Sequence, residues 1–217
     1  MSAPAVQERG GPASPARERI LVTADRLFYG TGIRAVGVER VITEAGVARM
    51  TFFRHFPSKD DLVVAFLARR VGTAQEALAR VRAEHPGEPR RVLEHFAAQV
   101  SDEAGVAEFR GCEFVNTAAE FYDSTHPVRR VVADHRAWIT ERLAEALTGL
   151  GHPAPRRTAE LLLMLRTGFI VASSLEGLTS GDAEFERAWW LLVGDPPDGD
   201  AGTSCEPAQA GENSAGG

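Results

Sequence analysis

The spacing of apolar residues is the feature that most constrains the fold of this chain. Between residues 17 and 193 apolar side chains recur at helical intervals, as in Ile20, Ala24, Leu27 and Phe28, and no alternating run of strand length occurs. Because that period places apolar side chains on one face of an α-helix, the pattern predicts an all-α fold. With 217 residues, 44% of them hydrophobic, the chain can bury a sizeable core as one domain or two small ones.

Glycine, proline and capping residues divide the helical region. Gly30 and Gly32 are expected to end the first helix, and Gly46 separates the second from the third. Ser58, followed by two acidic residues, is a favourable start for a fourth helix. The sequence predicts the first helix around 20–28 and the others at 38–45, 48–56, 58–83, 90–102, 106–121, 127–149, 156–178 and 183–193.

Both ends of the chain have compositions that disfavour folding. Residues 1–16 are rich in Gly, Pro and Ala, and residues 194–217 contain no aromatic residue and no β-branched residue except Thr203. Such segments cannot bury enough apolar area to offset the entropy of ordering. We therefore expect a disordered N-terminus, a folded region from 17 to 193 and a disordered acidic tail.

The distribution of charge bears on the kind of partner. The formal net charge of −6 argues at first sight against nucleic acid. However, five acidic residues and no Lys or Arg lie in the tail, whereas the segment 17–56 holds seven arginines against four acidic residues, a balance of +3. The N-terminal part of the folded region can therefore face DNA.

Three short helices form a candidate DNA-binding unit. Two of them, joined by the tight turn at 45–47 and braced by the preceding helix, match the arrangement that places a recognition helix in the major groove. The segment 48–55 would form roughly 12 Å of helix, comparable with a groove about 12 Å wide. Phe52 and Phe56 are one turn apart and are expected to face the core. The candidate DNA contacts are Arg49, Met50, Thr51, Phe53, Arg54, His55 and Lys59.

The segment 20–62 resembles the DNA-binding domain of the TetR family of bacterial transcriptional repressors. The similarity is strongest over 45–62, AGVARMTFFRHFPSKDDL. Met50 stands where glycine is common in the family, Phe53 where tyrosine is usual, and Gly37 and Ala48 where hydroxyl residues are usual. Without the tyrosine hydroxyl, Phe53 offers only apolar contact, so the grip on the DNA backbone is expected to rest on Thr51, His55 and Lys59.

The resemblance also implies the division of the chain and its partners. Residues 17–62 would be the helix-turn-helix DNA-binding domain, and residues 63–193 an all-helical effector-binding and dimerisation domain. The protein would bind a double-stranded operator as a homodimer and release it when a small molecule binds. The segment 156–178 supports dimerisation independently, because it is apolar around the helix and one monomer core cannot cover every face.

Polar residues on apolar helices are candidates for the effector site. Asn116 and Glu120 share one helical face, and Arg166 interrupts an apolar run, where a buried guanidinium requires an acidic partner or an anionic ligand. The candidate effector contacts are Asn116, Glu120, Trp138 and Arg166. The alternatives are a structural ion pair of Arg166 with Glu120 or Glu113, and ordinary core polarity.

Several other classes of function lack a signal in the sequence. No phosphate-binding glycine loop, zincin motif or nucleophile elbow occurs, and the histidines show no metal-ligand spacing with Cys112 or Cys205. We therefore expect no enzyme, no cofactor and no metal. Without a signal peptide or a run of about 18 apolar residues, we also expect a cytoplasmic protein with no membrane contact.

The sequence thus predicts a TetR-like repressor relieved by a small-molecule effector. Two alternatives stay open at this point. One is a helical ligand-binding or protein-interaction module that no longer binds an operator. The other is a transcriptional activator that uses the same DNA-binding helices.

Overall fold

The computed structural model describes residues 14–104, 109–176 and 182–194. These residues form nine α-helices and no strand, which confirms the predicted all-α fold. The helices are α1 (Pro15–Thr31), α2 (Val38–Ala45), α3 (Arg49–His55), α4 (Lys59–Glu84), α5 (Pro89–Ala104), α6 (Glu113–Glu120), α7 (Pro127–Gly149), α8 (Pro155–Glu176) and α9 (Asp182–Val193).

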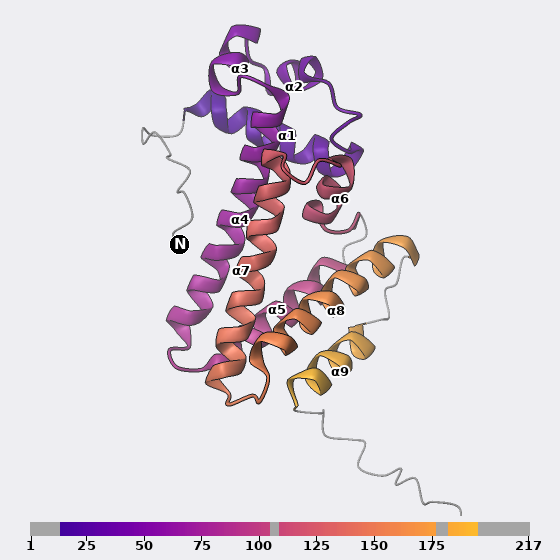
Figure 1. Ribbon diagram of the computed structural model, residues 1–217. Helices are drawn as coiled ribbons and strands as arrows, with labels where there is room; N and C mark the ends of the chain where they lie inside the picture. Colours follow the sequence, from indigo (N-terminus) through magenta and orange to yellow (C-terminus); the bar gives the residue numbers. More distant parts are fainter. Residues whose placement is uncertain (1–13, 105–108, 177–181, 195–217) are drawn as a thin grey trace, which may run out of the picture.

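Helices α1, α2 and α3 form a compact head at one end of the molecule (Figure 1). They contact one another, and α1 also packs on the start of α4. The turn between α2 and α3 is tight because Gly46 adopts the left-handed conformation, with φ of 61°. A capping box starts α4, in which Ser58 Oγ accepts from the Asp61 backbone N–H and the Asp61 carboxylate accepts from the Ser58 N–H.

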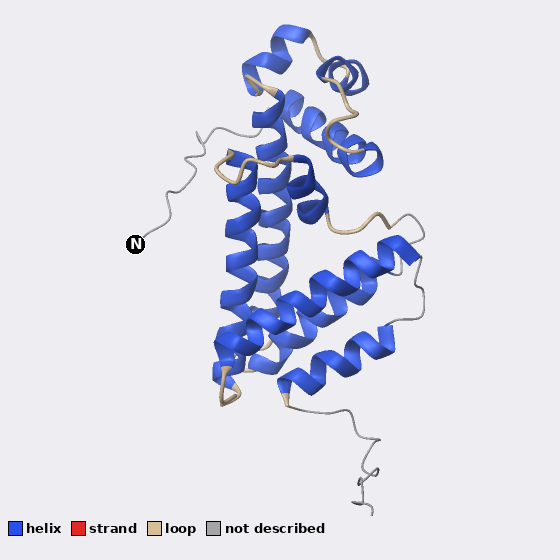
Figure 2. Cartoon of the chain, turned by 45° about the vertical axis from the view of Figure 1, so that its right-hand side comes forward, coloured by secondary structure: helices blue, strands red, loops and turns tan. Residues whose placement is uncertain are grey.

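The remaining helices form a body that α4 joins to the head without interruption. Helices α5 and α7 each pack against α4 and α8 and against each other, and α9 lies mainly on α8 (Figure 2). The short helix α6 packs on α7 and sits close to the head (Figure 1). Since α4 belongs to both regions, the expected division at residue 62 falls inside a helix.

Helix α8 has an unusually exposed apolar surface. Among its large side chains, Met164 is 65% exposed and Leu175 is 79% exposed, and Leu191 on α9 is 55% exposed. The stretch Pro155–Leu175 is long and apolar enough to cross a membrane by length and composition, with a mean hydropathy of 1.4, although no such run was expected from the sequence. The core helix of a helical bundle has the same properties, and α8 packs against α5, α7 and α9.

The predicted helix over 106–121 is wrong over residues 109–112, and its residues 106–108 lie outside the described part of the chain. Helix α6 begins only at Glu113, because Gly111 has a φ of 83° and Cys112 is extended at the N-cap. The expected disorder of residues 1–16 is wrong at its end, because α1 begins at Pro15, a favourable first helical residue. Helix α1 continues through Gly30 and ends at Gly32, the second of the two glycines expected to end it. The expected disorder of residues 1–13 and 195–217, and the end of the eighth helix at 178, lie outside the described residues.

Candidate functional site

The recognition helix α3 is anchored to the core of the head by two phenylalanines. Phe52 is fully buried and Phe56 is 2% exposed, and their ring centroids are 6.0 Å apart. This confirms the expectation that both rings face inward. On the opposite side, Met50 is 80% exposed and Arg49 and Arg54 are exposed. Helix α3 therefore presents two guanidinium groups and one thioether to a partner.

Arg49 is held in place by neighbours within the head. Its guanidinium forms an ion pair with Glu39 of α2 and lies over the Phe53 ring, 5.3 Å from the centroid. Phe53 itself is only half exposed, because it packs edge-on against Phe52 at 5.2 Å between centroids. Phe53, expected among the outward-facing DNA contacts, is therefore only partly exposed, and its contact with DNA stays a prediction. The ring supports Arg49 from below.

The other expected DNA contacts lie at the margin of this surface. Thr51, His55 and Lys59 are half-buried, and His55 Nε2 has no solvent contact and no hydrogen-bond partner. Burial, with the charges of Arg54 and Arg17, lowers the pKa of His55. Burial also lowers the pKa of Lys59, although nearby carboxylates oppose the shift.

A second region of interest is the junction between head and body. The carboxylate of Glu120, the last residue of α6, accepts hydrogen bonds from the backbone N–H of Ile33 at 2.9 Å and of Arg34 at 2.6 Å. In return, Arg34 Nη2 donates to the Glu120 carbonyl oxygen at 2.7 Å. Ile33 and Arg34 belong to the loop between α1 and α2, so these bonds join the body directly to the head.

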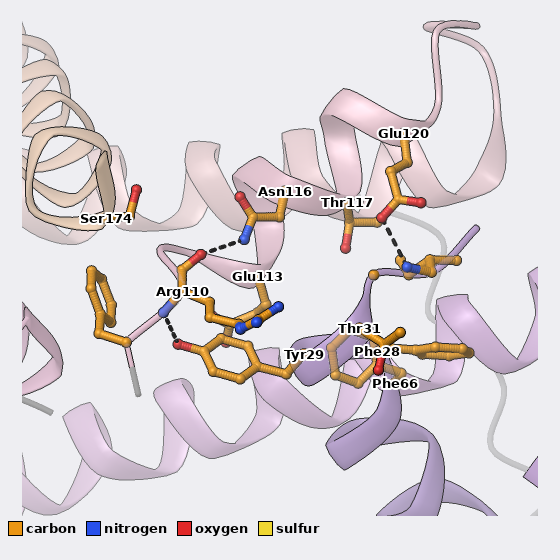
Figure 3. A pocket seen from close by; sticks show the side chains of 13 residues that line it. Phe28, Tyr29, Thr31, Phe66, Arg110, Glu113, Asn116, Thr117, Glu120 and Ser174 are labelled. Carbon is orange, nitrogen blue, oxygen red and sulfur yellow. Dashed lines mark hydrogen bonds between the residues drawn. The ribbon is translucent and has the colours of Figure 1, made fainter. Parts of the chain in front are cut away.

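A cavity of about 560 Å³ opens beside this junction. Its wall from α6 carries Asn116, Thr117 and Glu120, which face residues of α1 across the space (Figure 3). Asn116 Nδ2 donates to the carbonyl of Arg110 at 2.8 Å, and the backbone N–H of Arg110 donates to the Tyr29 hydroxyl at 3.0 Å. The lining residues are Phe28, Tyr29, Thr31, Gly32, Ile33, Phe66, Phe109, Arg110, Glu113, Asn116, Thr117, Glu120 and Ser174.

The four expected effector contacts do not meet in one cavity. Asn116 and Glu120 line the junction cavity, whereas Trp138 and Arg166 line a separate cavity of about 40 Å³ inside the body. That space holds about a water molecule or two but no organic effector. Trp138 and Arg166 could contact an effector only if the smaller cavity widened.

The small cavity is also lined by a buried histidine, His135. His135 is 7% exposed and is stacked between Phe114, at 4.0 Å, and Trp138, at 5.7 Å between centroids. Burial, with the charges of Arg166 and Arg136, lowers the pKa of His135 to about 4. Burial also raises the pKa of the neighbouring Cys112 thiol. Both side chains are therefore neutral near pH 7.

In the part of the chain that the structure describes, no group of three or more His, Cys, Asp or Glu side chains is arranged to hold a metal ion.

Comparison with known proteins places the head in a defined family. Residues 20–66 match the family described as bacterial regulatory proteins, tetR family. A solved structure of SCO4454, a TetR-family transcriptional regulator from Streptomyces coelicolor, is 34% identical and superposes with a TM-score of 0.72 over 82% of this chain and 92% of that chain. The similarity thus includes the body as well as the head.

Two curated relatives differ in the direction of their regulation. The transcriptional repressor NemR of Escherichia coli is 24% identical over 132 residues, which are 60% of this chain and 66% of that protein. The transcriptional activator FasR of Mycolicibacterium smegmatis is 35% identical over 71 residues, 31% of this chain and 32% of that protein. The chain therefore spans about two thirds of the length of the first relative and about a third of the second.

Proposed function

Because the chain belongs to the TetR family of bacterial transcriptional regulators, we propose that it is a DNA-binding repressor that a small-molecule effector releases from its operator. The observation that carries the proposal is the outer face of α3, where Arg49, Met50 and Arg54 are exposed on a helix whose opposite face is locked into the core. A rigid helix with exposed guanidinium groups can read base edges in a major groove.

The proposed contacts divide by their position on the surface. Arg49, Met50 and Arg54 face outward and are assigned to base edges and nearby phosphates. Thr51, His55 and Lys59 lie at the margin and are assigned to the DNA backbone. Phe53 is assigned a supporting role beneath Arg49, with at most its exposed edge touching the DNA.

We propose that the protein acts as a homodimer in the cytoplasm. The exposed apolar side chains Met164 and Leu175 of α8 and Leu191 of α9 form the surface assigned to the partner subunit. A four-helix interface of this kind is a common solution for two-fold dimers. The dimer would hold its two recognition helices about 34 to 36 Å apart, one turn of B-DNA.

The effector site is assigned to the junction cavity. Its volume of about 560 Å³ suits a small organic molecule, and its hydroxyl, amide and charged groups favour a polar one. Asn116 and Glu120, both expected effector contacts, lie on its wall. We assign no catalytic activity and no cofactor, since the relatives are regulators of transcription.

A salt-titrated gel shift on the DNA upstream of the protein's own gene tests the proposal. We expect tight binding to one site within it, weak binding to random duplex, and an affinity that falls steeply with salt because bound phosphates release counterions. Equal binding to both duplexes would favour the ligand-binding or protein-interaction module without operator recognition.

One relative is a transcriptional activator, so a separate experiment tests whether this protein represses or activates transcription. A reporter placed behind the operator is expected to rise when the gene is deleted, as for a repressor. A fall in reporter output would assign an activator instead.

A further inference from the structure

We infer that the Glu120 carboxylate is the contact that fixes the DNA-binding head on the body, and that opening this contact lowers operator affinity. The inference rests on the proposed function and deepens it, since it names the residue through which an occupied junction cavity acts on the recognition helix. Four observations support it.

The first observation is the position of the carboxylate at the end of its helix. Glu120 is the last residue of α6, where the helix dipole disfavours a negative charge. Two backbone N–H groups from the head offset this cost, at 2.9 Å and 2.6 Å. An acidic side chain at this place is therefore explained by what it binds across the junction, not by the stability of α6.

The second observation is the rigidity of the loop that it binds. Ile33 is 4% exposed, and Gly32 before it has a φ of 91°, a conformation that side chains rarely allow. A Cβ atom at Gly32 would lie 3.6 Å from Glu120 Oε1, so the loop approaches the carboxylate closely. The loop connects α1 to α2, so its position sets the position of the helix-turn-helix unit.

The third observation is that the contact runs in both directions. Arg34 Nη2 donates to the Glu120 carbonyl oxygen at 2.7 Å, and the Arg34 guanidinium also lies 5.2 Å from the centroid of the Tyr122 ring. Hydrogen bonds thus join the α1–α2 loop to the end of α6, and each side contributes both backbone and side-chain groups. The Arg110 backbone N–H, which donates to the Tyr29 hydroxyl of α1 at 3.0 Å, is a further direct bond between body and head.

The fourth observation is that the same carboxylate lines the junction cavity. Phe28 and Tyr29 line it from the head, and Asn116 and Thr117 line it from α6 (Figure 3). An occupant that donates a hydrogen bond to Glu120, or that separates the two walls, competes with the Ile33 and Arg34 N–H groups. Occupancy then changes the freedom of the head without any change in α3 itself.

The consequence for DNA binding follows from geometry. A dimer reaches both half-sites of an operator only when its two recognition helices keep a fixed separation. Releasing the loop lets each head move about α4, so binding both half-sites costs additional entropy. A single half-site imposes no such requirement, because one head can bind it in any orientation.

The test compares two variants of the full-length chain. Glu120→Gln keeps the size of the side chain but replaces one acceptor oxygen with a donor that cannot bind an N–H group. Asp123→Asn is the matched control, since it removes one charge nearby from a carboxylate that accepts from Thr125 in its own turn, at 2.8 Å. Affinity is measured for a two-half-site operator and for a duplex with one half-site.

For Glu120→Gln we expect operator affinity to fall about tenfold, the loss expected when a charged acceptor of hydrogen bonds is removed, with half-site affinity unchanged. Hydrogen exchange in a peptide spanning residues 29–36 should become faster by a similar factor. The Asp123→Asn variant should behave as wild type in each assay. An unchanged operator affinity, or an equal loss on operator and half-site, would overturn the inference.

A second variant keeps the test decisive if Glu120→Gln folds poorly. Arg34→Ala removes the bond to the Glu120 carbonyl and the contact with the Tyr122 ring but keeps the two backbone bonds to the carboxylate, so it should shift operator affinity in the same direction by a smaller factor. Failure of the proposed function and failure of the inference give different results. If the wild-type protein does not prefer its operator, the proposed function fails, whereas a wild-type preference that Glu120→Gln and Arg34→Ala leave intact contradicts only the inference.

Discussion

Replacing Arg49 with alanine should reduce discrimination between DNA sequences more than it reduces general affinity for DNA. Arg49 is the first residue of α3, and its guanidinium is positioned by Glu39 and by the Phe53 ring, 5.3 Å away. A positioned guanidinium can form paired hydrogen bonds with guanine, and each such pair is worth about 1–3 kcal/mol of discrimination. The expected loss is therefore about 5- to 150-fold for each half-site, and both half-sites contribute in the dimer.

The stability of the head should change little in the same variant. The side chains of Arg49 and Glu39 are 63% and 66% exposed, and an exposed pair of this kind is worth at most about 1 kcal/mol. The cation–π contact adds about 0.5–1 kcal/mol at an exposed site. The variant should thus stay folded, so a large loss of operator affinity reports on recognition and not on unfolding.

Fluorescence anisotropy with the operator and with a scrambled duplex, each at several salt concentrations, measures the two effects separately. Arg156→Ala on α8 is a suitable control, since it removes a guanidinium that is 61% exposed and paired with Glu141 and Glu160. We expect wild-type discrimination in this control and a large loss in Arg49→Ala. An equal loss on operator and scrambled duplex would refute the assignment of Arg49 to base edges.

Three further predictions follow from burial and exposure. Phe52→Ala should lower the free energy of unfolding by about 3–5 kcal/mol in urea denaturation, because the ring is fully buried; a loss below about 1 kcal/mol would contradict its anchoring role. Burial, with the charge of Arg166, holds the pKa of His135 at about 4 in the folded protein. Between about pH 6.5 and pH 4 the histidine is therefore protonated in the unfolded chain but not in the folded protein, which favours unfolding. Stability should decrease by roughly 3 kcal/mol down to about pH 4, and unfolding curves of His135→Phe should lack this part of the decrease. Met164→Glu, at a position 65% exposed, should shift the protein to monomers in sedimentation velocity, whereas Glu160→Gln on the same helix should not.

Local signals in the sequence were sufficient to predict most of the helices. The expected limits of the helices at 38–45 and 127–149 coincide with α2 and α7, because Gly37 and Gly46 flank the first and Pro127 starts the second. These signals act within one turn of the helix end and need no tertiary contact. The burial of Phe52 and Phe56 was predictable for the same reason, since spacing alone places both on one face.

Features that depend on contacts between distant residues could not be predicted in this way. The extended segment before α6 requires a φ of 83° at Gly111, where a Cβ atom would lie 3.3 Å from the Ser174 side chain of α8. Helical periodicity contains no information about that neighbour. Likewise, the partners of Glu120 are backbone groups 86 and 87 residues away, which no side-chain pattern identifies. The one available signal was an acidic residue at a helix C-terminus, where the dipole disfavours it.

The split of the expected effector contacts between two cavities leaves α6 as the element common to both. Glu113, its first residue, lines both cavities, and the Arg70 Nε atom lies 3.8 Å from its carboxylate. Arg70 in turn pairs with Asp25 of α1 at 2.9 Å, so each end of α6 reaches the head through an acidic residue.

The two connections differ in strength. Arg70 and Asp25 are about one third exposed, at 36% and 33%, and ion pairs of this exposure contribute about 1 kcal/mol or less and weaken with salt. Hydrogen bonds to a charged acceptor contribute about 1.5–3 kcal/mol each, and the two at Glu120 bind the backbone directly. A shift of α6 would therefore be transmitted to the head chiefly through Glu120, whereas the Glu113 end can exchange partners at little cost.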